Sequence, residues 1–336
     1  MRERITQTGE SIGSSLIWAV ALFSLLVFAA PLSWFGESLA DLRWHVGSTA
    51  FVLSLAGMAF LPRKRVAFFC MLCLAVYNVF PGLRVYLPST ADDVLTGTEV
   101  TLVQVRWEED PTDSLETKLN TELADIAVIT GIAPGARESL KQNLLDWPYS
   151  MGSPTSNGEV GELEHGLGTM VFSKYPLDNA EIICFAENTI LLDAQVEIDG
   201  PPVHLRVVNL PPAGPGDREQ DREALMVELE ARPWDLRTIF AIDLGASDTS
   251  MAYNRMRGLG DLADARQGIG RQANFKASFG GFALPGVSVP RQFTFVGGEI
   301  GVLDRFSETI TAADRERPLF RGDNHSAITT RLRIVE

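Results

Sequence analysis

The N-terminal part of this chain constrains its fold most strongly, because three long apolar runs follow one another there. The first run, residues 14–35, contains no charged residue. The second and third runs, residues 44–61 and 66–83, are shorter and contain no Asp, Glu, Lys or Arg. A helix needs about 20 apolar residues to cross a bilayer core. The pattern therefore predicts a membrane anchor over residues 1–83 with three transmembrane helices.

Basic residues near the ends of these runs predict their orientation. Arg2 and Arg4 precede the first run, and Arg63, Lys64 and Arg65 lie between the second and the third. Because basic flanks stay in the cytoplasm, the N-terminus is expected inside and everything after residue 83 outside. We therefore expect a bacterial inner-membrane protein, in contact with the lipid bilayer, whose C-terminal part lies in the periplasm.

A cleaved signal peptide is the alternative interpretation of the first run, because Arg2 and Arg4 resemble a charged n-region. Residues 28–30 make a poor small-x-small cleavage site, however, and two more apolar runs follow. Both features favour an uncleaved helix.

A stripe of small residues marks one face of the second run. Ala50, Ser54 and Gly57 recur at helical spacing. Small residues let another helix approach closely. The neighbour is expected to be the first or third helix of the same chain.

After the apolar runs the sequence changes to alternating β-rich and amphipathic segments. Residues 84–97 read as a linker, and residues 98–336 as one α/β layered domain. Strands are expected at 100–107, 125–130, 169–173, 190–198, 203–210, 238–243, 293–295 and 327–335, helices at 113–123, 137–147 and 217–231, and irregular chain at 258–286.

The net charge of −14 belongs mostly to this domain, because most acidic residues follow the apolar runs. A surface of that sign repels a nucleic acid backbone. We therefore expect no nucleic acid partner.

Seven segments of the domain follow one another in a characteristic order: 100–107 (VTLVQVRW), 124–131 (ADIAVITG), 168–177 (GTMVFSKYPL), 239–246 (IFAIDLGA), 262–268 (LADARQG), 302–306 (VLDRF) and 322–326 (GDNHS). They resemble the first strand and the ADIVxLQE, GxxIxSRYPL, VxxGDFNA, LxDAxxG, IDHIF and SDHxP motifs of the endonuclease/exonuclease/phosphatase superfamily. The resemblance extends over essentially all of residues 98–336, and is greatest to bacterial members with N-terminal membrane helices. It implies a four-layer α/β/β/α sandwich.

The resemblance also implies Mg²⁺-assisted hydrolysis of phosphoesters. In that chemistry a carboxylate-held cation neutralises the phosphoryl oxygens, and an aspartate positions water. Asp243 matches the aspartate of GDFN, Asp304 that of IDH, and His325 the histidine of SDH. Asp304 and His325 would form a His–Asp pair that stabilises developing charge.

The family's metal site is degenerate in this chain. The changed positions are Gln104 (an asparagine in the family), Gly131 (the metal-binding glutamate), Gly245 (the asparagine beyond the GDFN aspartate) and Asn324 (the aspartate of SDH). Asp323 could replace the last of these as a metal ligand. Mg²⁺ needs near-octahedral oxygen ligands, so losing the glutamate predicts weak metal binding and no resident cofactor.

Two functional interpretations follow. We expect a catalytically degenerate periplasmic domain that acts as a binding module or as an accessory subunit of a larger membrane complex. Asp243 would then satisfy local amides, and Asp304 with His325 would be an inherited structural pair. The alternative is an active Mg²⁺-dependent phosphoesterase on a small or lipid-borne periplasmic substrate, with Asp243, Asp304 and His325 carrying the reaction.

Overall fold

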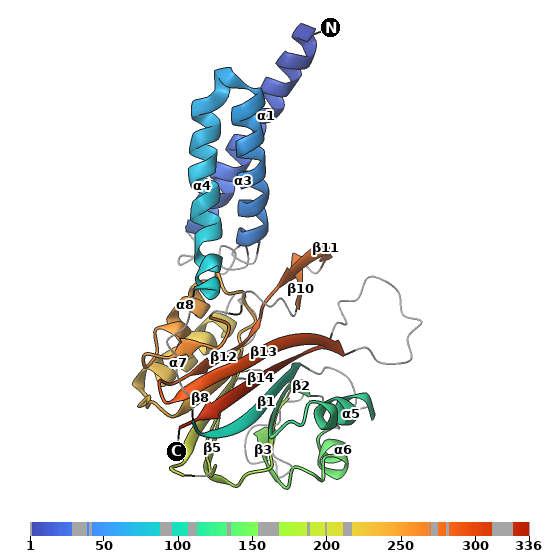
Figure 1. The fold of residues 1–336 in the computed structure, drawn as a ribbon, viewed down its shortest axis with the longest axis vertical. Coiled ribbons are helices and arrows are strands. Elements are labelled where there is room, and N and C mark those ends of the chain that lie inside the picture. The colour runs from blue at the N-terminus through green and yellow to red at the C-terminus, as the bar shows by residue number, and fades with distance from the viewer. Residues whose placement is uncertain are drawn as a thin grey trace.

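The chain forms a bundle of long helices standing on an α/β domain, as a computed structural model shows (Figure 1). The structure describes residues 2–28, 39, 42–87, 96–106, 113–132, 136–153, 168–186, 189–198, 200–210, 217–267, 269, 275–279, 282–310 and 325–335.

The bundle consists of α1 (Arg2–Phe28), α3 (Arg43–Phe60) and α4 (Arg65–Leu83), with the short 3-10 turns η2 (Pro62–Lys64) and η3 (Arg84–Tyr86) flanking α4. By length and hydropathy, one segment of the described chain, Pro62–Leu83, is able to cross a membrane. The apolar part of α1, Ser11–Val27, is shorter than this criterion requires. The three expected helices are therefore present, whereas three membrane crossings stay a prediction.

Small residues form the face of α3 that packs inside the bundle. Gly47, Ala50, Ser54 and Gly57 are all buried. A Cβ atom at Gly57 would lie 2.4 Å from the ring of Phe68 on α4, so only glycine permits this approach. The predicted stripe is confirmed, and the helix that it contacts belongs to the same chain.

Two six-stranded sheets build the domain. The first has the order β13-β14-β1-β2-β4-β3, with bounds β1 (Thr98–Arg106), β2 (Ile126–Ile132), β3 (Tyr149–Ser153), β4 (Gly168–Ser173), β13 (Ile300–Ile310) and β14 (His325–Ile334). The second has the order β5-β6-β7-β8-β12-β9, with bounds β5 (Leu177–Ala186), β6 (Thr189–Val196), β7 (Val203–Asn209), β8 (Thr238–Asp243), β9 (Ala263–Asp264) and β12 (Gln292–Val296). The remaining elements are α5 (Asp113–Thr121), α6 (Ala136–Asn143), α7 (Asp217–Ala231), α8 (Met251–Arg257) and the strands β10 (Phe275–Phe279) and β11 (Phe282–Val289).

Three apolar cores separate four layers. The central core lies between the two sheets and takes residues from both. A second core joins the outer face of the first sheet to α5 and α6 through Leu119 and Leu140. A third joins the second sheet to α7 and α8 through Leu225 and Met256. The α/β class is confirmed, and the layers follow the predicted α/β/β/α order.

Sequence patterning misses some elements of this fold. The expectation of irregular chain over residues 258–286 is wrong in part, because β9, β10 and β11 lie there. Patterning also fails to predict β5 as a full strand. In this edge strand the polar residues Asp178 and Asn179 follow Leu177, and the strand pairs with β6 through an irregular register, so it lacks the alternation of a half-buried strand.

Candidate functional site

The candidate site lies where three strands end. Strands β1 and β2 run parallel in the first sheet, and β7 and β8 run parallel in the second. Arg106 is the last residue of β1, Asp243 is the last residue of β8, and Thr130 lies near the end of β2. Because parallel strands present their carboxyl ends at one edge, residues far apart in the chain meet here.

The carboxylate of Asp243 is held by one positive charge and one hydroxyl. Its Oδ2 atom lies 3.1 Å from Nη1 of Arg106 and accepts a hydrogen bond of 3.0 Å from the Thr130 hydroxyl. The Asp243 side chain is 1% exposed and that of Arg106 25% exposed. Burying an unpaired carboxylate is costly, so Arg106 supplies the charge that makes this position tenable.

The second carboxylate oxygen of Asp243 differs from the first. Its Oδ1 atom is buried and has no hydrogen-bond partner within the described residues. Sequence patterning identifies Asp243 but not Arg106. The signal for Arg106 is a cation that directly follows the uncharged run of residues 100–105 in β1.

Glycines with left-handed backbone occupy two of the degenerate positions. Gly131 has a φ of 77°, where the pairing of β2 with β4 shifts register between Thr130 and Ile132. Gly245, just beyond Asp243, has a φ of 60°. Asparagine tolerates this region, but glutamate does not adopt it readily. At Gly131 the chain therefore lacks the carboxylate of the family's glutamate, and its backbone conformation also disfavours a glutamate at this position.

Replacing Gly131 with alanine is expected to lower the free energy of unfolding by about 1–2 kcal/mol, because a Cβ atom disfavours a left-handed backbone. Gly298→Ala is the matched control, since a Cβ there meets Leu236 at an ordinary 3.5 Å. Denaturant unfolding of the full chain in detergent measures both variants. Equal losses would contradict the backbone argument.

The side chain of Gln104 forms hydrogen bonds that connect the two sheets. Its amide donates to the carbonyl of Phe293 at 3.1 Å and its oxygen accepts from Thr294 at 2.8 Å, both on β12. Gln104 is 2% exposed. It thus ties β1 to the opposite sheet.

The structure does not bring Asp304 and His325 together. Asp304 pairs in register with Arg331, and Ile310 pairs with His325, six residues further along β13. At about 3.3 Å per residue, that offset is roughly 20 Å. The expected His–Asp pair is therefore wrong. Asp323, Asn324 and the side chain of His325 lie outside the described residues.

An irregularity in β13 explains why Asp304 points away from the site. The register shifts between Val302 and Asp304. Arg305 then faces the interior and donates to the carbonyl of Gln292 at 3.1 Å, while Asp304 forms a surface ion pair with Arg331 at 2.9 Å. Successive strand residues alternate faces, so an inward Arg305 requires an outward Asp304.

A buried charge cluster lies behind this edge of the second sheet and is not predicted from the sequence. Arg266 is fully buried and binds Asp264 at 2.6 Å and Asp248 at 3.1 Å. The Tyr253 hydroxyl donates to Asp264 at 2.6 Å, and Arg305 lies 3.8 Å from the same carboxylate. We name these five residues the Arg266 cluster.

Charge dominates the chemistry of the Arg266 cluster. Burial works to raise the pKa of Asp264, but Arg266, Arg305 and the Tyr253 hydroxyl together hold it below its usual value. Burial, with the charge of Asp264, raises the pKa of Tyr253 well above its usual value. The cluster is therefore a set of fixed charges that joins β9, β13 and α8, and its tyrosine stays protonated.

The residues around Asp243 do not fit a divalent cation. They offer one carboxylate and one hydroxyl, and a guanidinium already occupies the carboxylate. Within the described ranges, no group of three or more His, Cys, Asp or Glu residues is placed to hold a metal ion. The oxygen-rich octahedral shell that Mg²⁺ prefers is not assembled by these residues.

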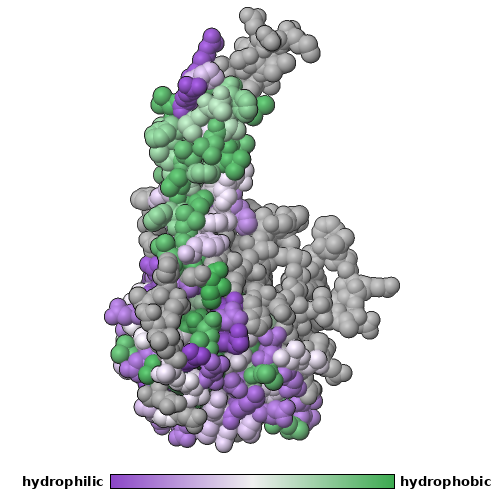
Figure 2. All heavy atoms as spheres, viewed as in Figure 1, coloured by the Kyte–Doolittle hydropathy of each residue, from purple (hydrophilic) through white to green (hydrophobic). Residues whose placement is uncertain are grey.

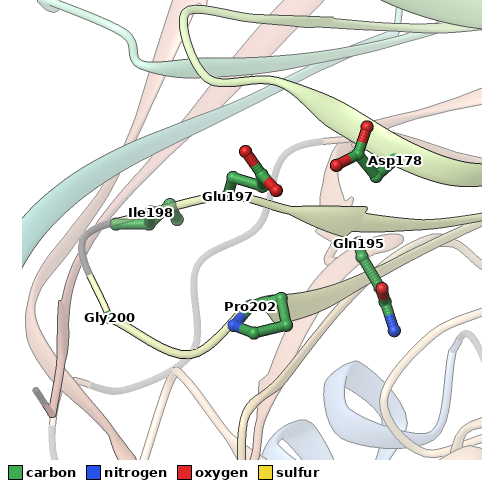
Figure 3. A pocket seen from close by; sticks show the side chains of 6 residues that line it. All are labelled: Asp178, Gln195, Glu197, Ile198, Gly200 and Pro202. Atoms are coloured by element: carbon green, nitrogen blue, oxygen red, sulfur yellow. The ribbon is translucent and has the colours of Figure 1, made fainter.

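A pocket of about 350 Å³ lies at the other end of β6 and β7, beside the turn that joins them (Figure 3). It is lined by Asp178, Gln195, Glu197, Ile198, Gly200 and Pro202. The Asp178 carboxylate accepts a hydrogen bond from the protonated Glu197 and adds its negative charge, and both effects raise the pKa of Glu197. Because β7 begins at this turn and ends opposite Asp243, the pocket is separate from the candidate site.

The domain has the fold of the endonuclease/exonuclease/phosphatase superfamily. It is similar to an endonuclease/exonuclease/phosphatase from Bacteroides vulgatus, with a TM-score of 0.52 and 14% identity over 70% of this chain and 99% of that chain. It is also similar to D. rerio TDP2 complexed with a single-strand DNA product (0.51, 16%, 70% and 99%) and to a mannosyl-6-phosphatase of Bacteroides thetaiotaomicron (0.52, 12%, 69% and 99%). No protein-family model and no curated protein matches the sequence.

Proposed function

We propose, from the fold that it shares with endonuclease/exonuclease/phosphatase structures, that this chain is a membrane-anchored and catalytically degenerate relative of those proteins. Residues 98–336 would form a periplasmic domain that binds a ligand or serves as an accessory subunit of a larger membrane complex. Residues 1–83 would anchor it in the bacterial inner membrane.

The pairing of Arg106 with Asp243 carries this proposal. An aspartate at this strand end would need to face a divalent metal ion to serve metal-assisted hydrolysis, and here it faces the guanidinium of Arg106 at 3.1 Å. A guanidinium stays protonated under all ordinary conditions, so it supplies a permanent charge without any open coordination position. Gly131 adds no oxygen ligand and has a backbone unsuited to the missing glutamate.

The outer surface of the helices supports membrane anchoring. Large apolar side chains point outward, including Trp18 (75% exposed), Val52 (65%) and Phe69 (57%). Figure 2 shows hydrophobic residues over the helices and mostly hydrophilic residues over the domain. An apolar surface of this extent is unusual on a soluble protein and suits contact with lipid.

Polar side chains of the helices point toward the inside of the bundle. Asn78 of α4 is buried and donates to the Ser24 hydroxyl of α1 at 2.7 Å, while Arg43 of α3 donates to the carbonyl of Tyr77 at 2.9 Å. Polar residues inside and apolar residues outside are the arrangement expected of helices in a bilayer.

The direction of the helices agrees with the proposed orientation. Figure 1 places the N-terminus and the turn between α3 and α4 at the end of the bundle far from the domain. That turn carries Arg63 and Lys64. Basic residues in the cytoplasm would then leave the domain on the periplasmic side.

The proposal predicts that the full chain in detergent does not hydrolyse p-nitrophenyl phosphate or bis-p-nitrophenyl phosphate with Mg²⁺ or Mn²⁺. The physical reason is that Arg106 occupies the carboxylate that would face the metal. Release of p-nitrophenol should match that of Asp243→Ala purified in parallel, which controls for contaminating phosphatases. Turnover that Asp243→Ala abolishes would refute the proposal.

One observation favours the alternative, an active Mg²⁺-dependent phosphoesterase on a small or lipid-borne substrate. The unpartnered Oδ1 of Asp243 is a buried oxygen that could accept a further ligand. Calorimetric titration of the full chain with Mg²⁺ separates the two functions. Saturable binding that Asp243→Ala removes would favour the enzyme.

Purification from native membranes in a mild detergent tests the accessory role, and a lone monomer would speak against it.

A further inference from the structure

Arg43 is a buried cation at the end of the helical bundle that faces the domain. It is the first residue of α3 and is 9% exposed. A Cβ atom at Gly82 would lie 2.6 Å from the ring of Trp44, so the start of α3 packs against the end of α4. Figure 1 shows this end of the two helices beside the domain. Arg43 therefore lies inside the bundle, close to its domain-side end.

One contact of Arg43 is explained by a proline. Pro81 lies inside α4. Because proline has no N–H, the carbonyl of Tyr77 lacks the donor that residue i+4 normally supplies in a helix. Nη2 of Arg43 donates to this carbonyl at 2.9 Å, and the guanidinium lies 4.5 Å from the centroid of the Tyr77 ring. Arg43 thus connects α3 to α4 where the helical hydrogen bonding is interrupted.

These contacts leave the charge of Arg43 without a counter-ion within the described residues. A carbonyl and an aromatic ring are not anions, and the first turn of α3 contains no acidic residue and no side-chain cap. Nε of Arg43 is buried and has no hydrogen-bond partner in the described part of the chain. Arginine stays charged and has five N–H donors. Because an isolated buried charge is costly, and the first turn of a helix adds positive potential, this position favours a bound anion.

Aromatic side chains are exposed at the same end of α4 and in η3. Tyr77 and Phe80 of α4 and Tyr86 of η3 are 42%, 55% and 52% exposed. Tyrosine and tryptophan side chains gather where lipid tails meet head groups. In a membrane this arrangement would place Arg43 near the level of the lipid phosphates, where basic residues between helices bind head groups. The anion that fits is therefore a phospholipid phosphate.

The exposed face of α4 continues from Tyr77 as an apolar strip. Val76, Cys73, Phe69 and Val66 are exposed, and Figure 2 shows hydrophobic residues over the helices. From Tyr77 to Val66 the helix rises about 17 Å, at 1.5 Å per residue. This length is about half of a 30 Å hydrocarbon core. The strip therefore matches the acyl chains of one leaflet.

We propose that Arg43 and the first turn of α3 bind the phosphate of an outer-leaflet phospholipid, whose acyl chains lie along the exposed face of α4. This inference rests on the proposed membrane anchoring. The N–H groups that Arg43 does not use on the Tyr77 carbonyl would donate to phosphate oxygens. The lipid would neutralise a charge that the protein leaves unbalanced, and would be held at the end of the bundle nearest the domain.

Native mass spectrometry of the full chain tests the proposal. The chain is washed free of lipid in a mild detergent, and dioleoyl phosphatidylglycerol, dioleoylglycerol or inorganic phosphate is added back separately. We expect one retained phosphatidylglycerol and no retained dioleoylglycerol, which has the same tails without the phosphate. Equal retention of these two lipids would overturn the phosphate site. Retention of inorganic phosphate to the same extent as the phospholipid would overturn the lipid.

Substitution of Arg43 locates the site. Arg43→Gln is expected to lower the retained phosphatidylglycerol about tenfold, the order of effect of one charge-assisted hydrogen bond, whereas Arg43→Lys keeps the charge and should retain more. Arg65→Gln is the matched control, because Arg65 also donates to a helix carbonyl, that of Met58 at 3.1 Å, but is exposed at the other end of α4. Unchanged retention in Arg43→Gln, or an equal loss in Arg65→Gln, would overturn the site.

Flotation of the native chain with phosphatidylglycerol vesicles separates this inference from the anchoring on which it rests. A chain that floats with the vesicles but retains no phospholipid in detergent would overturn the phosphate site and leave the anchoring intact. A chain that does not float would overturn both. The comparison of lipids with and without a phosphate uses the native chain, so it decides the proposal even if Arg43→Gln does not fold.

Discussion

Replacing Asp264 with asparagine is expected to destabilise the domain by about 3–5 kcal/mol, the range found when one partner of a buried ion pair is removed. The side chain of Asp264 is 1% exposed and balances Arg266, which is fully buried, and Arg305, which is also buried. Asparagine keeps the shape but removes the charge. The buried guanidinium of Arg305 would then lose its carboxylate neighbour, and that of Arg266 would be left with Asp248 at 3.1 Å.

For a domain of this size the change corresponds to a lower unfolding midpoint, on the order of 10 °C. Thermal unfolding of the full chain in detergent, followed by near-ultraviolet circular dichroism, measures it. Asp304→Asn is the matched control, because it removes the same charge from an Asp–Arg pair whose side chains are 44% and 52% exposed. Exposed pairs contribute about 0–1 kcal/mol. Similar losses in both variants would contradict the structural role of the Arg266 cluster.

The effect of Asp264→Asn should also depend on pH. Because the folded-state pKa of Asp264 lies below its ordinary value of 3.8, its charge stabilises the fold above that pH. The contribution is lost as the pH falls below 3.8 through the folded-state pKa. The difference between the native chain and Asp264→Asn is therefore expected to be constant near neutral pH and to shrink in strong acid.

The second large effect is expected for Arg106→Ala, which should cost about 2–3 kcal/mol and leave the Asp243 carboxylate buried with one hydroxyl partner. The cost is smaller than for Asp264 because the Arg106 side chain is 25% exposed and water can partly replace it. Arg331→Ala, which breaks the exposed pair with Asp304, is the control and should change the unfolding midpoint little.

Two further measurements connect this stability change to the proposed function. Adding Asp243→Asn to Arg106→Ala should recover part of the lost stability, since the unpaired charge is then gone. Added Mg²⁺ should not raise the unfolding midpoint of the native chain beyond a matched concentration of NaCl. An Arg106→Ala protein as stable as Arg331→Ala, or a native chain stabilised by Mg²⁺, would contradict an arginine-occupied site.

Long periodic segments were the most predictable part of the fold. The helices α3, α4 and α7 and the strands β7 and β8 lie within one or two residues of their sequence-based bounds, because their apolar patterns are strong and local. Edge strand β5 and hairpin β10–β11 were not predictable in the same way. Each of these pairings joins strands that are adjacent in the chain but contains register shifts, which local patterning does not detect.

The residues of the candidate site also differ in how far the sequence predicts them. Motif order alone placed Asp243 at a strand end and identified Gly131 as a lost ligand. It also paired Asp304 with His325, which lie six residues out of register between β13 and β14. The contact between Arg106 and Asp243 spans 137 residues of sequence, so no local pattern could reveal it.

The sequence by itself determined the apolar helices, because these depend on local periodicity. Its resemblance to the endonuclease/exonuclease/phosphatase superfamily implied the order of the layers and the missing glutamate at Gly131. Tertiary structure alone decided that Arg106 neutralises Asp243, that Arg305 rather than Asp304 faces the interior, and that Asp264 balances two buried arginines. Each of these depends on which strand ends meet and on which face a side chain lies. A shift of one residue reverses the face of a strand, and composition does not record such a shift.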